Sequence, residues 1–358
     1  EVRQKCLFTT HTPLKEANDV FAKKLVLEYQ PDFPWHLSGL LDGAGRLNMA
    51  RAGLYFSSSA NAVSQRHQEV MADIFPEFQI GCVTNGVHVP SWVSPEMAEV
   101  FDAHLPAWRQ NNQRLEKAES LPTETVWAAH QSAKKKLIEY AFSAAGRKLD
   151  QDRLTIVLAR RFALYKRPEL ILSDLGRLKR ISAAGGGLQI IFSGKAHPQD
   201  KAGMERLRQI WLTASASDEK LPIVFLSGYG IEIARQLVAG ADLWLNTPLA
   251  PFEACGTSGM KAALNGVPQL SIADGWWAEG GRHGQNGWVI EDRSGLDPDR
   301  AGLLDADDIY RLLETEIMPL YYRQRPIWQK MMVRAIALGG FRFSAQRAME
   351  EYWQRAKL

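Results

Sequence analysis

The stretch LTIVLARRFALYKRPELILSDLGRLKRISAAGGGLQIIFSG (Leu154–Gly194) contains a strand, a basic turn, a helix and a second strand in that order. Its two ends, LTIVLA (154–159) and LQIIFSG (188–194), are short apolar runs typical of strands buried on both faces. Between them, RPELILSDLGRLKRISAA (167–184) has the apolar spacing of an amphipathic helix. Strands alternating with helices in this way predict a doubly wound parallel α/β sheet.

The same alternation continues along the chain, from about Leu154 to Ile290, which is long enough for a whole Rossmann-like domain. Strand signals are fewer before Asn85, and after Asp305 the pattern is helical up to SAQRAMEEYWQR (344–355). Further buried strands are predicted at CLFTT (6–10), PIVFLSG (222–228), ADLWLN (241–246) and PQLSI (268–272), and further helices at 201–217 and 230–241.

Length and composition indicate a globular protein with two cores. The chain has 358 residues, whereas a single core stops growing near ~250–300 residues. Its 43 basic and 40 acidic residues leave a formal charge of +3, which favours neither a nucleic-acid nor a membrane-surface partner. The longest basic run, AKKKL (133–137), is predicted to lie on a solvated helix face.

Three cysteines, Cys6, Cys82 and Cys255, have neither metal-binding nor redox spacing. Their odd number and apolar surroundings suggest reduced thiols in a cytoplasmic protein, and no metal site is expected. No apolar stretch approaches the ~18 residues of a membrane span.

A second stretch, TPLAPFEACGTSGMKAALNG (247–266), places Lys261 among small and apolar residues, eight positions after Glu253. Thr257 or Ser258 is expected to cap the helix that carries Lys261. The positive end of that helix disfavours an ammonium ion, and desolvation adds to this, so the pKa of Lys261 should lie below its usual ~10.4. Such a lysine beside a phosphate cradle is a candidate to form a Schiff base with pyridoxal phosphate. The alternative is a lysine whose amine simply reaches solvent at a helix start.

Four cations, Arg160, Arg161, Lys166 and Arg167, follow directly after the strand at 154–159. Ligands of doubly wound folds bind beyond the carboxyl ends of the strands. Because clustered like charges repel, the four cations predict anionic company, such as two phosphate groups. The alternative is a solvated basic turn.

Five segments together resemble the α-glucan phosphorylases, which are the pyridoxal-phosphate-dependent glycogen, starch and maltodextrin phosphorylases. The likeness is strongest to the bacterial branch and covers nearly the whole chain. The segments are FTTHTP (8–13), TNGVHVPSWVSPEM (84–97), RRFALYKRP (160–168), SGKAHPQD (193–200) and EACGTSGMKAALNGVPQLSIADGWW (253–277).

The resemblance implies two Rossmann-like doubly wound domains that face each other across a cleft, the GT-B arrangement of many glycosyltransferases. Residues 1–85 would be the remnant of a truncated first domain, and residues 86–322 the cofactor-binding second domain. Residues 323–358 would be terminal helices that pack back toward the first domain. The family's glycine-rich loop would precede FTTHTP, so we expect this chain alone to bind pyridoxal phosphate weakly or not at all and to show little activity.

The resemblance also implies roles for individual residues. Lys261 would carry the cofactor as a Schiff base, and Arg161 would hold the substrate phosphate. His11 could instead tie a turn together, and Trp92 could be plain core packing. The remaining implied contacts are Thr257, Ser258, Arg160 and Lys166 with the cofactor phosphate, Tyr229 and Trp92 near the cofactor, and Glu253, Cys255, Gly256, Asn85 and His11 around the reacting glucose.

The implied reaction is phosphorolysis of terminal α-1,4 bonds of an α-glucan by inorganic phosphate, which yields glucose 1-phosphate. One alternative is a nucleotide-sugar glucosyltransferase of the same fold. Such enzymes often have a second glutamate at the place of Lys261, so this lysine speaks against it. The other alternative is an inactive glucan-binding fragment. Relatives often form dimers, so a homodimer is also an expectation. Trp276 and Trp277 could stack on sugar or pack in the core.

Overall fold

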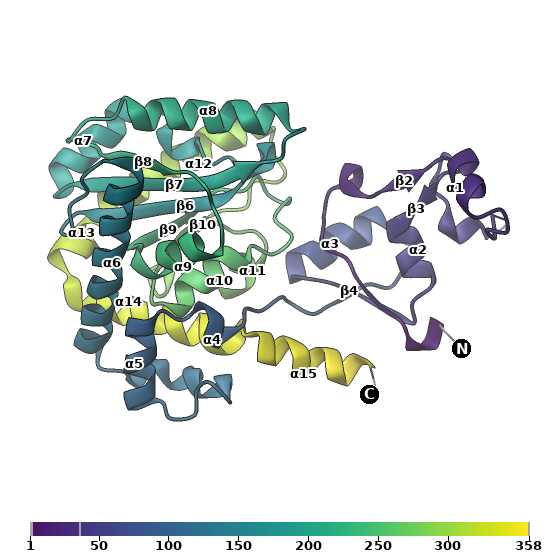
Figure 1. Cartoon of the computed structure of the whole chain (residues 1–358), viewed down its shortest axis with the longest axis horizontal. Helices are drawn as coiled ribbons and strands as arrows, with labels where there is room; N and C mark the ends of the chain where they lie inside the picture. The colour runs from purple at the N-terminus through teal and green to yellow at the C-terminus, as the bar shows by residue number, and fades with distance from the viewer. Residues whose placement is uncertain (1–2, 36, 357–358) are drawn as a thin grey trace.

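The computed structural model describes residues 3–35 and 37–356, which form a larger and a smaller lobe (Figure 1). The larger lobe is built on a six-stranded sheet in which every neighbouring pair is parallel. Its strands are β6 (Leu154–Phe162), β7 (Leu188–Ala196), β8 (Ile223–Leu226), β9 (Leu243–Asn246), β10 (Gln269–Ile272) and β11 (Gly287–Ile290).

The order of these strands is β11-β10-β9-β6-β7-β8. The chain starts in the middle at β6, adds β7 and β8 on one side, and then returns to add β9, β10 and β11 on the other. This is the doubly wound order, so the predicted α/β fold class is confirmed. The direction of winding reverses between β6 and β9, which is where ligands bind in such sheets.

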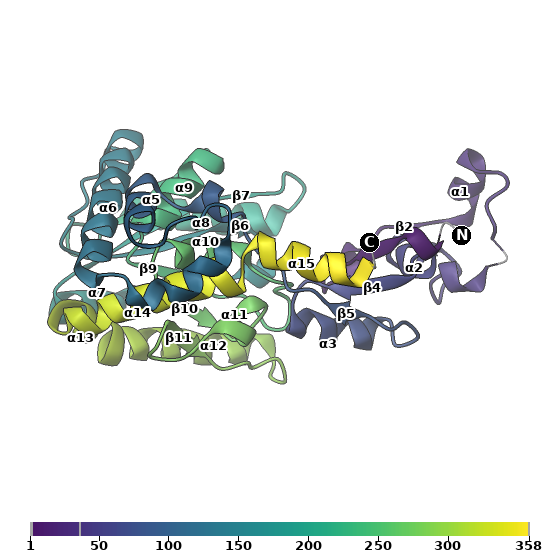
Figure 2. The ribbon, with the colours of Figure 1, turned by 90° about the horizontal axis from the view of Figure 1, so that it is seen from below.

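Helices cover both faces of this sheet (Figures 1 and 2). Side chains of β6 alternate between the two cores: Ile156 and Leu158 pack into one, and Val157 packs with α6 and α9 in the other. The helices of this lobe are α4 (Val89–Trp92), α5 (Pro95–His104), α6 (Thr123–Ala145), α7 (Leu175–Gly185), α8 (Lys201–Ser215), α9 (Ile231–Gly240), α10 (Thr257–Leu264), α11 (Trp276–Gly280), α12 (Pro298–Leu312), α13 (Met318–Arg323) and α14 (Arg325–Ala337).

The helix predicted from residue 167 begins later, at Leu175. Arg167 has a φ of 41°, and Pro168 follows it, so the backbone there cannot continue as a regular α-helix. Asp174 then caps α7, because its side chain accepts a 2.7 Å hydrogen bond from the N–H of Arg177.

The solvated face predicted for AKKKL is wrong for Lys134. Its side chain has no exposure, and its amine donates to Asp242 Oδ2 at 2.6 Å and to the Arg153 carbonyl at 2.7 Å. Lys135 and Lys136 are exposed, as predicted. Successive residues of a helix point in different directions, so a run of three lysines cannot share one face.

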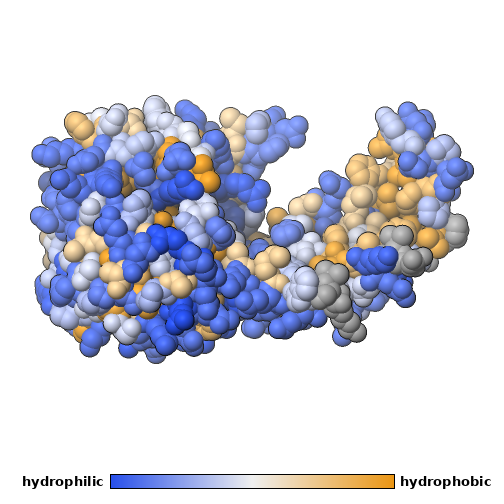
Figure 3. All heavy atoms as spheres, turned by 60° about the horizontal axis from the view of Figure 1, so that its bottom comes forward, coloured by the Kyte–Doolittle hydropathy of each residue, from blue (hydrophilic) through white to orange (hydrophobic). Residues whose placement is uncertain are grey.

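The smaller lobe has a parallel sheet of order β1-β4-β5 and a separate antiparallel pair, β2 with β3. Exposed apolar side chains gather on this lobe (Figure 3), among them Val20, Phe21, Met49 and Phe56. Its elements are β1 (Leu7–Thr9), β2 (Val20–Phe21), α1 (Lys23–Tyr29), β3 (Leu47–Asn48), α2 (Met49–Tyr55), β4 (Ser59–Ala62), α3 (Gln65–Ile74) and β5 (Gly81–Cys82).

The terminal helix α15 (Ala345–Ala356) runs from the larger lobe alongside the smaller one (Figure 2). Its Tyr352 hydroxyl accepts from Asn61 Nδ2 at 3.1 Å, and Arg355 donates to the Cys82 carbonyl at 2.7 Å. The helix predicted at 344–355 is thus confirmed, whereas the domain boundaries at residues 85 and 322 stay predictions. In residues 3–35 and 37–356, no helix is both long and apolar enough to span a membrane.

Candidate functional site

Three predicted site residues form a buried ion cluster where β6 and β9 end. Arg160 lies near the end of β6, Lys166 lies in the turn after it, and Glu253 lies on the loop after β9. Arg160 Nη2 is 2.6 Å from Glu253 Oε2, and Lys166 Nζ is 2.6 Å from Glu253 Oε1. The Glu253 side chain is only 5% exposed, so both contacts are largely shielded from water. The cluster therefore sits at the place where the winding of the sheet reverses.

Burial and charge set the ionisation of this cluster. Burial lowers the pKa of Lys166 to about 8, and the Arg160 cation adds to this effect. Burial alone would raise the pKa of Glu253, but the adjacent Lys166 and Arg160 cations lower it below its usual value. The carboxylate is thus ionised at neutral pH and is held between two cations.

The expectation that phosphate groups supply the negative charge around the four cations needs correction. Glu253 pairs with both Arg160 and Lys166, which leaves these three groups with one positive charge in excess, and Arg167 Nη2 lies 2.6 Å from Asp305 Oδ2. The fourth cation, Arg161, is exposed beside this buried cluster. Carboxylates from distant parts of the chain therefore supply part of the negative charge that the sequence assigned to phosphates, and the excess positive charge is left for a bound anion.

The loop from Glu253 to Gly256 is fixed by the segment that follows β10. Asp274 accepts from the N–H of Glu253 and of Gly275, both at 2.8 Å. The N–H of Trp276 donates to the Cys255 carbonyl at 2.9 Å. A Cβ on Gly275 would lie 2.4 Å from that carbonyl oxygen, and its φ is +52°, so only glycine fits there.

Lys261 lies in the second turn of α10, on the face of an aromatic ring. Its Nζ is 3.8 Å from the centroid of Trp92. The buried side chain of Asn265 donates to the carbonyls of both residues, at 2.8 Å to Trp92 and 2.9 Å to Lys261. Burial lowers the pKa of the half-buried Lys261. The pKa of Lys261 is therefore shifted downward, as expected, and burial is the cause.

The start of α10 differs from the expectation. Its N-cap is Gly256, with a φ of +86°, and it has no side-chain cap. Thr257 and Ser258 are the first two helical residues, so neither is the N-cap, and the prediction that one of them caps the helix is wrong. Glycine at this position leaves the first backbone N–H groups of the helix without a side-chain partner.

Three other predicted site residues, Cys255, Tyr229 and His11, have different surroundings. The Cys255 thiol faces the backbone of Asn85, and burial raises its pKa well above the usual value. Burial also raises the pKa of the half-buried Tyr229, against the opposite pull of the nearby Arg160 cation. His11 is exposed in the smaller lobe, and no hydrogen bond or ion pair within residues 3–35 and 37–356 joins it to Glu253 or Lys261.

Sequence reasoning missed Asp274, although a signal was present. Asp274 follows the predicted strand PQLSI after one intervening residue, at the same edge of the sheet as the basic turn. Trp276 and Trp277, which follow, are each only 1% exposed, so they pack in the core and do not stack on sugar. Within the described ranges, no group of three or more histidine, cysteine or acidic side chains could hold a metal ion.

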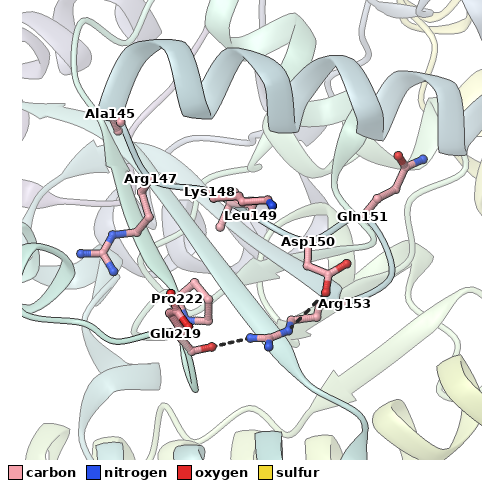
Figure 4. A pocket seen from close by; sticks show the side chains of 10 residues that line it. Ala145, Arg147, Lys148, Leu149, Asp150, Gln151, Arg153, Glu219 and Pro222 are labelled. Carbon is pink, nitrogen blue, oxygen red and sulfur yellow. Dashed lines mark hydrogen bonds and ion pairs between the residues drawn. The ribbon is translucent and has the colours of Figure 1, made fainter.

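A surface cavity of about 780 Å³ lies at the opposite edge of the sheet (Figure 4). Its lining residues Leu149 and Arg153 precede β6, and Pro222 precedes β8. Arg153 donates to the Glu219 carbonyl at 2.6 Å. The cavity therefore belongs to the amino ends of the strands and is separate from the ion cluster.

Asp274 should make the stability of the larger lobe depend on pH. Burial raises its pKa from 3.8 to about 7. Between these values the folded state keeps a proton that the unfolded state has released, so stability falls as the pH rises through about 7. We expect the wild type to lose up to about 2–3 kcal/mol relative to Asp274→Asn between about pH 5 and pH 8. Urea unfolding at several pH values measures this, and parallel curves for the two proteins would contradict it.

Comparison of the sequence with known proteins identifies the family of this chain. The family model described as carbohydrate phosphorylase matches residues 2–279. The maltodextrin phosphorylase of Thermococcus litoralis is 38% identical over 98% of this chain and 46% of its own length. The glycogen phosphorylases of Aquifex aeolicus and Mycobacterium bovis are 36% and 33% identical, again over 98% of this chain, and over 57% and 46% of their own lengths. The chain thus spans about half the length of these relatives. It belongs to the carbohydrate phosphorylase family.

Proposed function

We propose that this chain is the cofactor-binding part of an α-glucan phosphorylase that uses inorganic phosphate to release glucose 1-phosphate from α-1,4-glucans. One observation carries the proposal. A lysine of lowered pKa, Lys261, lies one helix turn beyond the loop that holds a buried carboxylate between two cations. The relatives named as maltodextrin and glycogen phosphorylases support the same conclusion.

The residues present fit pyridoxal phosphate. The lowered pKa gives Lys261 a larger fraction of neutral amine, which is the form that reacts with an aldehyde. The uncapped start of α10 offers backbone N–H groups to a phosphate. Arg160 Nε is buried and lacks a hydrogen-bond partner among the described residues, so Arg160 has a donor to spare. Lys261 would hold the cofactor aldehyde, while Thr257, Ser258, Arg160 and Lys166 would hold its phosphate.

The chain's own residues would act mainly by binding and charge compensation. Arg160 and Lys166 would keep two phosphate groups close that otherwise repel, and the exposed Arg161 would hold the substrate phosphate. Glu253, with Cys255 and Gly256, would bind the hydroxyls of the reacting glucose. When bound, the cofactor would supply a phosphate group that exchanges a proton with the substrate phosphate. The Trp92 ring beside Lys261 would limit access of water.

Two alternatives remain distinguishable. A nucleotide-sugar glucosyltransferase would use a second carboxylate where Lys261 lies, and a cation on an aromatic ring does not supply one. An inactive glucan-binding fragment would bind maltodextrin and turn nothing over. We also propose that the protein forms a homodimer. Its location is proposed to be cytoplasmic, which the three free cysteines fit.

The test is an assay for glucose 1-phosphate from maltodextrin, with phosphate and pyridoxal phosphate each present or omitted. It is run on this chain and on a version extended to the length of the relatives. We expect the extended protein to require both additions and this chain to show little turnover. Glucosyl transfer from UDP-glucose, or maltodextrin binding without turnover by the extended protein, would contradict the proposal.

A further inference from the structure

The start of α3 in the smaller lobe is bonded directly to the site loop of the larger lobe. The Ser64 hydroxyl donates to the Ala254 carbonyl at 2.6 Å, and Ala254 lies between Glu253 and Cys255. We propose that Ser64 is a positioning residue, which holds the Glu253 loop in register with the smaller lobe. This inference rests on the proposed function of that loop.

Ser64 is suited to this task because its side chain is fixed from two sides. The residue has no exposure, and its hydroxyl oxygen accepts the N–H of His67 at 3.0 Å as the N-cap of α3. The one hydroxyl proton then points at Ala254. A serine that only capped a helix would leave that proton to solvent or to its own lobe.

A second contact orients α3 for this bond. Glu279, on α11 of the larger lobe, accepts from the N–H of Gln65 at 2.9 Å. It also accepts from the Thr84 hydroxyl at 2.9 Å, in the segment that joins the lobes. A carboxylate at the N-terminus of a helix is favoured by the helix dipole. Glu279 therefore fixes the end of α3 from which Ser64 reaches across.

The consequence is that the smaller lobe and the ion cluster share one short connection. The Ala254 carbonyl is held by Ser64, the N–H of Glu253 by Asp274, and the Cys255 carbonyl by Trp276. Only the first of these three contacts comes from the smaller lobe. A shift of α3 would therefore move the loop at the residue next to Glu253.

Hydrogen exchange measured by mass spectrometry on this chain tests the inference without requiring any enzymatic activity. In Ser64→Ala, we expect the peptide covering residues 252–260 to exchange roughly three- to tenfold faster, because one buried hydrogen bond is lost. Ser64→Gly should do the same while keeping α3 nearly capped, since glycine is a tolerated N-cap. Ser64→Thr keeps the hydroxyl and should restore slower exchange.

The matched control is Ser94→Ala. Ser94 is the N-cap of α5, a ten-residue helix like α3, and its hydroxyl accepts the N–H of Met97 at 3.2 Å. We expect this variant to loosen residues 95–104 and to leave residues 252–260 unchanged. Equal acceleration of the 252–260 peptide in Ser94→Ala, or no acceleration in either the alanine or the glycine variant of Ser64, would overturn the inference. Lack of glucose 1-phosphate formation by the extended protein would instead count against the proposed function alone.

Discussion

Lys261→Arg is expected to abolish borohydride-trapped labelling by pyridoxal phosphate of the peptide that contains residue 261. Arginine keeps the positive charge on the Trp92 ring, which Lys261 contacts at 3.8 Å. Its guanidinium stays protonated and cannot condense with an aldehyde. In the wild type, burial lowers the pKa of Lys261, so its amine should also be labelled at lower pH than exposed lysines are.

The measurement is an absorbance scan with excess pyridoxal phosphate, followed by reduction and peptide mapping. Excess cofactor is needed because we expect weak binding by this chain. Lys179→Arg is the control, because Lys179 is exposed and pairs with Asp218 at 2.7 Å. It should leave labelling of the peptide containing residue 261 unchanged. At a pH where exposed lysines are not labelled, a label that persists on this peptide in Lys261→Arg, or that maps only to other peptides in the wild type, would overturn the site assignment.

Glu253→Gln is expected to destabilise the larger lobe by about 3–5 kcal/mol, because it leaves buried cations without their counter-charge. Arg160 and Lys166 both contact this carboxylate within 2.6 Å. The double variant Glu253→Gln/Lys166→Met should recover part of the loss, since one uncompensated cation is then replaced by an apolar side chain.

Urea unfolding followed by the fluorescence of the buried tryptophans of the larger lobe measures these differences. Glu232→Gln is the control, because the Glu232 side chain is 80% exposed and lies 3.7 Å from Arg235. It should change stability by less than about 0.5 kcal/mol. If Glu253→Gln is no more destabilising than Glu232→Gln, the Glu253 carboxylate does not stabilise the larger lobe by compensating the charges of Arg160 and Lys166.

Much of the fold could be predicted because the larger lobe's strands are buried on both faces. The sequence predicts β6 and β7 as apolar runs, and the strand order that the structure shows is that of a doubly wound sheet. Helix starts were predicted less well. The start of α7 depends on the backbone at Arg167 and on the Asp174 cap, and no apolar spacing reports either.

The sequence by itself determined the fold class, the basic turn after β6 and the lysine on α10. These features follow from the spacing of apolar residues and of motif residues, which are local properties of the chain. Only the tertiary structure decided which charges neutralise each other. Glu253 meets Arg160 and Lys166, and Lys134 meets Asp242, across more than eighty residues of sequence in every case. Such pairings depend on how strand ends converge, and a linear pattern does not encode that convergence.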